Sequence, residues 1–386
     1  MSGPVVADLG EAGILARITP LLPSGRDVLL GPGDDCAVLA APDGRYCVST
    51  DVLVEGRHFR TDWSSGFDVG ARAAAQNLAD VAAMGARPVA LVACLVLPGA
   101  TPVDWVVDLA RGMALRCREA GAAVVGGDLS AGEGLVVAVT VHGDLEGRAP
   151  VLRSGARPGQ ALVLAGAPGR AAAGLALLEA GWGRRDDDEA GLAGAAAVPE
   201  TAAVAETDAA LALAEDCAAV FRAPRPPLKA GPALAGIGAS AMMDVSDSLV
   251  RDCGRIALAS GVVIDIDDPD DDCAALAADR AELEGVVTLV PEARSAARGT
   301  DAARGTGAAV GTGGIRPDPR ETARNWVLTG GEDHGMLATV PADAARSLPE
   351  GARVIGRVRR AGGAGPGVLV GTRPWSGAQG WDHFRA

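Results

Sequence analysis

Valine-rich apolar runs alternate with stretches of helical periodicity over residues 1–150 of the chain. Runs typical of strands, bounded by Gly, Pro or polar residues, lie near residues 46–50, 89–97, 122–127 and 134–145. Apolar residues recur at intervals of three and four over residues 67–86 and 103–122, which predicts a helix in each of these stretches. We therefore predict an α/β domain over residues 1–150.

Gly and Pro punctuate the chain around residues 153–160 and mark the start of a second predicted domain, residues 151–386. Strands are expected in this domain near residues 161–166, 262–267, 326–331, 336–340 and 352–358. Two low-complexity segments, near residues 183–210 and 290–320, show no periodicity. We interpret these segments as surface insertions into an α+β domain.

The acidic composition limits what the chain can bind. Its 386 residues carry a net charge of −14, which is unsuited to nucleic acid, because that backbone is bound by clustered Lys and Arg. Lys229 is the only lysine, and its surroundings, "PPLKAGP", do not form a G-x-x-x-x-G-K-[ST] phosphate loop. A phosphate compound bound here would therefore need metal ions to offset the repulsion between like charges.

Cysteine usage and hydropathy indicate the compartment. The seven cysteines are scattered without a C-x-x-C pair, which favours reduced thiols in a cytoplasmic protein. The longest apolar run, residues 88–98, falls far short of the ~20 residues that span a bilayer. The N-terminus carries Asp8 and Glu11 and shows no signal-peptide pattern, so neither secretion nor a membrane partner is expected.

Several acidic and hydroxyl side chains stand out, and most of them lie where an apolar strand ends in a loop, the usual position of ligand-binding groups in α/β proteins. They are Asp34, Asp35, Thr50, Asp51, Asp128, Asp244, Ser246, Asp247, Glu332 and Asp333. Asp80 differs, because it lies in a predicted helix of mainly Ala, Leu, Val and Met, beside Gln76 and Asn77. A carboxylate on a partly buried helix face is costly unless a cation or donors accompany it.

Each of these groups alone also has an ordinary structural interpretation. Asp34 could finish a turn, Ser246 or Asp247 could cap the following helix, and Asp128 could form an Asx-turn. His58 near a strand end could be a satisfied polar residue, and no H-E-x-x-H spacing supports a zinc site. Together, however, the oxygen-bearing side chains favour a common site for magnesium, which prefers carboxylates plus the oxygens of a bound phosphate.

Several sequence blocks, in order, resemble those of the thiamine-monophosphate kinase family. They are "GPGDDCAVL", "VSTDVLVEGRHF", "NLADVAAMGARP", "GGDLSAGEGLVVAVTVHG", "LRSGARPGQALVLAG", "MMDVSDSLVRDCGRI", "GGEDHGMLATVP" and "GWDHF". The resemblance implies the two-domain fold of aminoimidazole-ribonucleotide synthetase, with an N-terminal α/β domain that dimerises and binds ATP and magnesium, and a C-terminal α+β domain. It also implies a homodimer and magnesium-dependent transfer of a phosphoryl group from ATP to thiamine phosphate.

Roles carried over by matching position remain implications of the resemblance. Magnesium would be held by Asp34, Ser49, Thr50, Asp51, Asp80, Asp128, Asp244 and Asp247. ATP would contact Gly127, Asp128, Arg153 and Ser246, and thiamine phosphate would contact His58, Glu332 and Trp381. The catalytic groups would be Asp51, Asp80, Asp128 and Arg153. Trp381 would offer a flat ring to the cationic thiazolium.

The chain departs from the family pattern at a few positions, and other members of the superfamily must be weighed. The usual "GGEDYEL" is "GGEDHGM" here, which introduces His334 and Gly335, and "GGDT" is "GGDL", which introduces Leu129. The alternatives are an aminoimidazole-ribonucleotide synthetase-like enzyme and a catalytically silent nucleotide- or metal-binding protein. A selenophosphate synthetase is disfavoured because no reactive Cys and Lys pair occurs near the N-terminus.

Overall fold

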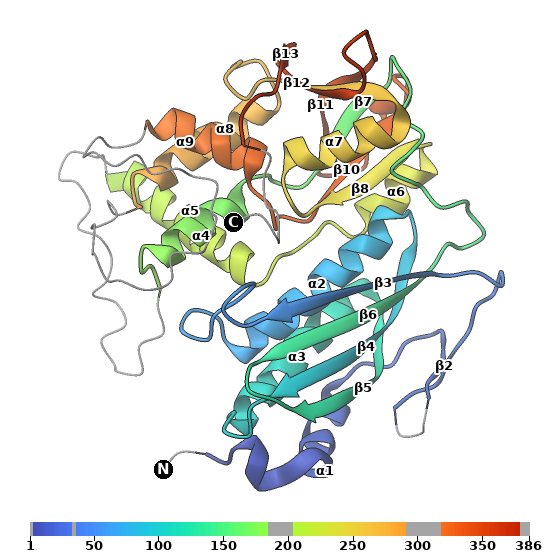
Figure 1. Cartoon of the computed structure of the whole chain (residues 1–386), viewed down its shortest axis with the longest axis vertical. Coiled ribbons are helices and arrows are strands. Elements are labelled where there is room, and N and C mark those ends of the chain that lie inside the picture. Colours follow the sequence, from blue (N-terminus) through green and yellow to red (C-terminus); the bar gives the residue numbers. More distant parts are fainter. Residues whose placement is uncertain (1–2, 33–35, 184–203, 291–317, 379–386) are drawn as a thin grey trace. The chain divides into compact units, whose positions relative to one another are not determined.

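The structure, a computed structural model, describes residues 3–32, 36–183, 204–290 and 318–378, which form two compact units. Unit 1 consists of Met1–Val151 together with Arg222–Ala233, and unit 2 of Leu152–Phe221 together with Leu234–Ala386. Each unit combines a sheet with helices (Figure 1). The segment Arg222–Ala233 thus belongs to unit 1, although the chain on both sides of it belongs to unit 2.

Unit 1 contains a four-stranded sheet in the order β3-β6-β4-β5 and a two-stranded sheet of β1 and β2. The strands are β1 (Val28–Leu30), β2 (Val38–Leu39), β3 (Cys47–Val54), β4 (Arg87–Leu97), β5 (Ala123–Ala131) and β6 (Val136–Asp144). The helices are α1 (Val6–Ile18), the 3-10 helix η1 (Thr19–Leu21), α2 (Gly66–Ala83) and α3 (Val103–Ala120). The strands and helices predicted for residues 1–150 are confirmed.

Helices α2 and α3 pack together closely enough to require glycine at the contact. A Cβ atom added to Gly70 would lie 1.9 Å from the carbonyl oxygen of Leu109, and one added to Gly112 would lie 2.0 Å from that of Phe67. Helix α2 begins with a capping box, in which Ser65 Oγ accepts from the Asp68 amide and the Asp68 carboxylate accepts from the Ser65 amide. The cap and the glycines together fix the axis of α2, which carries Asp80.

The two faces of the four-stranded sheet have different environments. One face packs against α2 and α3 around a core that includes Leu53, Leu91 and Val139 (Figure 1). The β1–β2 hairpin packs a smaller apolar cluster over the start of β4 and β5. On β3 the side chains of Val48 and Val52 stay 59% and 46% exposed, so this part of the second face is uncovered in the chain described here.

Unit 2 is built on a seven-stranded sheet in the order β13-β12-β9-β11-β7-β10-β8. The strands are β7 (Ala161–Ala165), β8 (Ala241–Val245), β9 (Val262–Ile266), β10 (Gly335–Val340), β11 (Ala352–Arg360), β12 (Gly367–Val370) and β13 (Arg373–Pro374). The helices are α4 (Arg170–Glu179), α5 (Val204–Arg222), α7 (Leu249–Ser260), α8 (Leu276–Val287), α9 (Pro319–Thr329) and the 3-10 helix η2 (Ala344–Arg346). Helix α6 (Ala230–Gly236) runs across the boundary between the units.

Four of the five strands predicted for the second domain are present, and one prediction is wrong. Residues 326–331, expected as a strand, form the end of helix α9 and the loop after it. Asp318 caps this helix through its side chain, Pro319 occupies the first turn, and Val327 and Leu328 complete its buried face. The short apolar run hid the helix because α9 begins inside the segment interpreted as an insertion.

The two predicted insertions are described only at their edges. Residues 204–210, expected to belong to the first insertion, instead begin helix α5. Residues 184–203 and 291–317 lie outside the described residues. Among the helices that the structure describes, none is long and apolar enough to cross a membrane.

Candidate active site

A hydroxyl and a carboxylate meet between β3 and α2 in unit 1. Side chains alternate along β3, so Ser49 and Asp51 face the helix layer with Leu53. Ser49 Oγ donates a hydrogen bond of 2.6 Å to Asp80 Oδ2, which brings two predicted site residues together. This bond supplies part of the compensation that a carboxylate on an apolar helix needs.

Two predicted ligands of the same unit lie elsewhere. Thr50 points to the other face of the sheet, where its hydroxyl donates to the carbonyl of Val139 at 3.0 Å and accepts from Thr140 Oγ1 at 3.1 Å. Asp128 is on β5, at the opposite edge of the sheet from β3, three strand spacings or roughly 14 Å away. Its carboxylate accepts from Ser130 Oγ at 3.0 Å. The described residues of unit 1 therefore do not bring Thr50 or Asp128 to Asp80.

Gly127 and His58 have local structural reasons for being where they are. A Cβ atom at Gly127 would lie 2.0 Å from the carbonyl oxygen of Ala93, so the pairing of β4 with β5 requires glycine at this position. His58 Nδ1 accepts from the amide of Val54 at 3.0 Å and closes the turn after β3. Neither contact tests the predicted role in binding ATP or thiamine phosphate.

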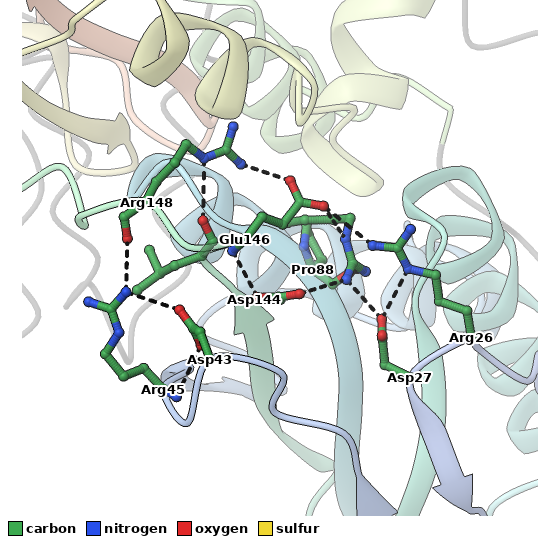
Figure 2. Close-up of polar contacts among 10 residues, drawn as sticks. Arg26, Asp27, Asp43, Arg45, Pro88, Asp144, Glu146 and Arg148 are labelled. Atoms are coloured by element: carbon green, nitrogen blue, oxygen red, sulfur yellow. Dashed lines mark hydrogen bonds and ion pairs between the residues drawn. The ribbon is translucent and has the colours of Figure 1, made fainter.

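An ion-pair network anchors the chain on both sides of the segment that contains Asp34 (Figure 2). Arg87 of β4 contacts Asp27, just before β1, at 2.8 Å, Asp144 at 3.1 Å and Glu146 at 3.0 Å. After β2, Arg45 pairs with Asp43 and donates to the carbonyl of Arg148. Asp34 itself lies outside the described residues. The network fixes the hairpin ends to the sheet, and Asp34 belongs to the connection between them.

Loops from three strands of unit 2 meet at one edge of its sheet. The ends of β7 and β8 lie beside the start of β10, since Met336 pairs with Ala165 on one side and with Asp244 on the other. The amide of Glu332 donates to the carbonyl of Ser246 at 2.8 Å. This edge therefore gathers the predicted residues Asp244, Ser246, Asp247 and Glu332.

Arg153 lies next to β8, the strand that carries Asp244. The carbonyl of Leu152 accepts from the amide of Met242, two residues before Asp244, at 3.0 Å. The carbonyl of Arg153 accepts from Ser260 Oγ at 3.2 Å, and its side chain is exposed. Trp381 lies outside the described residues.

A buried carboxylate that sequence reasoning missed holds the loop after β8. Asp252 Oδ2 accepts from the amides of Ser246, Asp247 and Ser248 at 3.2, 3.2 and 3.3 Å, and its other oxygen accepts from Arg255. Burial raises the pKa of Asp252 to about 6, against the lowering effect of Arg255. The available signal was an aspartate in the first turn of the helix that follows "DVSDS".

The loop before β10 is held by two further buried groups. The Asp333 carboxylate accepts from the amides of Gly169 and Ala171 at 2.6 and 2.7 Å, which ties this loop to the start of α4. Burial raises the pKa of Asp333 to about 6. Burial alone would lower the pKa of His334, but the carboxylates of Asp244 and Glu332 outweigh it and raise this pKa to about 10. The two carboxylates thus favour the protonated form of the His334 ring.

The charge environment differs among the predicted metal ligands. Asp247 forms an ion pair with Arg255 and lies 4.0 Å from Arg251. Ser248, not Ser246 or Asp247, caps helix α7 by accepting from the Arg251 amide. Within the described residues, no three His, Cys, Asp or Glu side chains lie close enough to hold one metal ion together.

This geometry has counterparts among known proteins. Residues 33–145 match the family model for AIR synthase related protein, N-terminal domain. Over 382 residues the chain is 41% identical to thiamine-monophosphate kinase of Mycobacterium tuberculosis (strain ATCC 25618 / H37Rv), covering 99% of this chain and 93% of that protein. The chain belongs to the thiamine-monophosphate kinase family.

Solved structures of thiamine-monophosphate kinases share the fold. The crystal structure from Stenotrophomonas maltophilia K279a is 28% identical, with a TM-score of 0.67 over 94% of this chain and 95% of that chain. The structure of AaThiL complexed with AMPPCP and TMP is 26% identical, with a TM-score of 0.64 over 98% of each chain. The predicted family and the predicted mixed α/β fold class are confirmed, whereas the roles of individual side chains remain predictions.

Proposed function

We propose that this chain transfers the terminal phosphoryl group of ATP to thiamine phosphate and so forms thiamine diphosphate. The single observation that carries the proposal is the 41% identity over 99% of the chain to a thiamine-monophosphate kinase. The complex of AaThiL with AMPPCP and TMP, which has the same fold, supports the pairing of a nucleotide with the thiamine substrate.

The residues suit a reaction that needs orientation more than proton transfer. The second pKa of a phosphate monoester is about 6, so the attacking phosphate is already largely dianionic at neutral pH. Catalysis then depends on aligning two polyanions and neutralising their charge. Arg153 supplies an exposed guanidinium beside β8, and we assign it to the transferred phosphoryl group. Ser246 and Gly127 would contact ATP, and Glu332, His58 and Trp381 the thiamine substrate.

The donor set fits magnesium. The candidate ligands offer only hydroxyl and carboxylate oxygens, which magnesium prefers over nitrogen or sulfur. They are Asp34, Ser49, Thr50, Asp51, Asp80, Asp128, Asp244 and Asp247. Asp247 already pairs with Arg255, so a metal ion there would compete with this guanidinium. When bound, magnesium would supply the positive charge that offsets the negative charge of the substrates' phosphate groups.

The reaction can be tested directly. Purified protein is incubated with ATP, magnesium chloride and thiamine phosphate, and thiamine diphosphate is measured by chromatography, with omission of magnesium as the control. We expect product only in the complete mixture. Nucleotide binding without product would favour a silent binding protein, and turnover of formylglycinamidine ribonucleotide would favour the synthetase; either result would contradict the proposal.

We further infer a homodimer formed through the part of the second face of the four-stranded sheet that is uncovered at β3. Val48, Thr50 and Val52 of β3 lie on this face, and the first and last are exposed apolar side chains. Apolar side chains exposed along one face of a strand are typical of a surface that a partner covers. The free cysteines and the acidic composition suit a cytoplasmic enzyme, which is the location we propose.

The dimer yields a specific prediction. Val52→Asp should weaken association about a hundredfold or more, because a two-fold interface would bury one unpaired carboxylate from each copy. Light scattering after size exclusion at micromolar concentration checks the mass. Leu258→Asp is the matched control, since Leu258 is 68% exposed on α7 of unit 2 and should leave the dimer intact. A Val52→Asp protein that remains a dimer would contradict this interface.

A further inference from the structure

The ring of His334 lies buried between two predicted site carboxylates. Its Nδ1 shares a hydrogen bond of 3.0 Å with Asp244 Oδ2. Its Nε2 is buried, makes no hydrogen bond within the described residues, and lies 3.5 Å from Glu332 Oε2, which is an ion-pair distance. The side chain of His334 is 5% exposed and that of Asp244 is 7% exposed, whereas that of Glu332 is 32% exposed. One ring therefore connects a group inside the unit to a group that a ligand can reach.

The backbone around this ring is strongly constrained. Glu332 and His334 have φ values of 70° and 51°, in the left-handed region that side-chain-bearing residues seldom adopt. Such a conformation persists only where the surroundings impose it, and it is common at ligand sites. Here the amide of His334 donates to the carbonyl of Val245 at 2.9 Å, and Asp333 ties the loop to α4. The main chain of Glu332 is thus fixed, and its carboxylate direction depends on side-chain torsions.

We propose that His334 is a positioning residue for thiamine phosphate, which fixes the direction of the Glu332 carboxylate by holding it against the buried Asp244. This inference rests on the proposed function and assigns a role to the histidine that replaces the usual aromatic residue of the family motif. A glutamate has three side-chain torsions to order, and ordering them before the ligand arrives lowers the cost of binding. The effect should fall on thiamine phosphate and not on ATP.

Steady-state kinetics of three variants test the proposal. His334→Leu removes both polar contacts and should raise the KM for thiamine phosphate about tenfold, with the KM for ATP changed less than twofold. His334→Gln can keep one donor and should raise the former KM about threefold. In a Glu332→Gln background, His334→Leu should add less than twofold, because its effect acts through Glu332.

A matched control separates positioning from stability. Asp279→Asn breaks another partly buried ion pair of unit 2, the one with Arg353, and should leave the ratio of the two KM values unchanged. Equal rises of both KM values in the His334 variants, or a lower melting temperature with unchanged KM, would overturn the proposal. If His334→Leu does not fold, the KM values of His334→Gln, alone and combined with Glu332→Gln, test the proposal instead.

Binding measurements keep this inference separate from the proposed reaction. Calorimetric titration of thiamine phosphate in the presence of AMPPCP and magnesium should show the same loss of affinity in the His334 variants. A wild-type protein that binds thiamine phosphate but forms no product would contradict the proposed function. The affinities of the wild-type protein and the His334 variants for thiamine phosphate would still test the role of His334. Wild-type protein that neither binds nor turns over thiamine phosphate would overturn both.

Discussion

Replacing Asp80 by asparagine should reduce kcat for thiamine diphosphate formation about a thousandfold, the scale seen when one preorganised electrostatic contact to a transition state is removed. The amide that replaces the carboxylate would keep an oxygen that can accept from Ser49 Oγ, so the contact of 2.6 Å seen at Asp80 need not be lost. The variant would lose the charge that a magnesium ligand supplies. We expect the same loss for Asp51→Asn, since Asp51 shares the face of β3 with Ser49.

The measurement pairs kinetics with stability. Initial rates at saturating ATP, thiamine phosphate and magnesium give kcat, and thermal unfolding followed by circular dichroism gives stability. Asp108→Asn, which breaks an exposed pair with Arg111 on α3, is the matched control and should keep wild-type activity. Full activity of Asp80→Asn at saturating magnesium would refute the role of Asp80 as a metal ligand. If Asp80→Asn instead loses much of its stability, its kinetics would not test this role, and the kcat of Asp51→Asn would then decide.

Gly70→Ala should destabilise unit 1 by about 3 kcal/mol or more, because the added methyl group would lie 1.9 Å from the carbonyl oxygen of Leu109. No rotamer can relieve this overlap, since a Cβ atom has a fixed position on the backbone. Helices α2 and α3 would have to separate, and the shared core of Val69, Leu109 and Met113 would loosen. For a unit of this size the melting temperature should fall by about 10 °C.

Gly254→Ala supplies the comparison. Gly254 also lies inside a helix, but a Cβ atom there would meet nothing closer than Val368 Cγ2 at 3.8 Å. Because alanine favours the helix more than glycine does, this variant should be neutral or stabilised by up to about 1 kcal/mol. If Gly70→Ala melts at the wild-type temperature, the helices are not packed as closely as the structure has them.

The helices α2 and α3 and the main strands of unit 1 could be predicted from the sequence, because their hydrophobic periodicities are long and uninterrupted. Helix α2 shows apolar spacing over several turns, and the valine-rich strands are bounded by clear turn residues. Helix α9 could not be predicted, because the only apolar pattern in its sequence is a short run that follows a segment without periodicity. Short runs of this kind do not distinguish a strand from a helix end.

The types of residue in the candidate site could be predicted from the sequence, but which of these residues lie close together could be predicted only in part. The period of two along β3 was enough to separate Thr50 from Ser49 and Asp51, although the family resemblance had grouped them. The distance of Asp128 from Asp80 depends on strand order, which no local pattern encodes. The three hydrogen bonds that Asp252 accepts from backbone amides depend on the path of the loop between β8 and α7. This path is a tertiary property that the sequence pattern does not reveal.

The discontinuous chain path of unit 1 has a consequence for its synthesis. Leu228 packs on the unit 1 core, the carbonyl of Ala223 accepts from Arg116 at 3.2 Å, and a Cβ atom at Gly231 would meet the carbonyl of Ala82 at 2.0 Å. These contacts come from a segment translated well after Val151. Residues 1–151 must therefore emerge from the ribosome with part of their core unpacked, and this core is completed only when residues up to 233 have been synthesised. A gene fragment that ends at residue 151 would encode an incomplete unit 1.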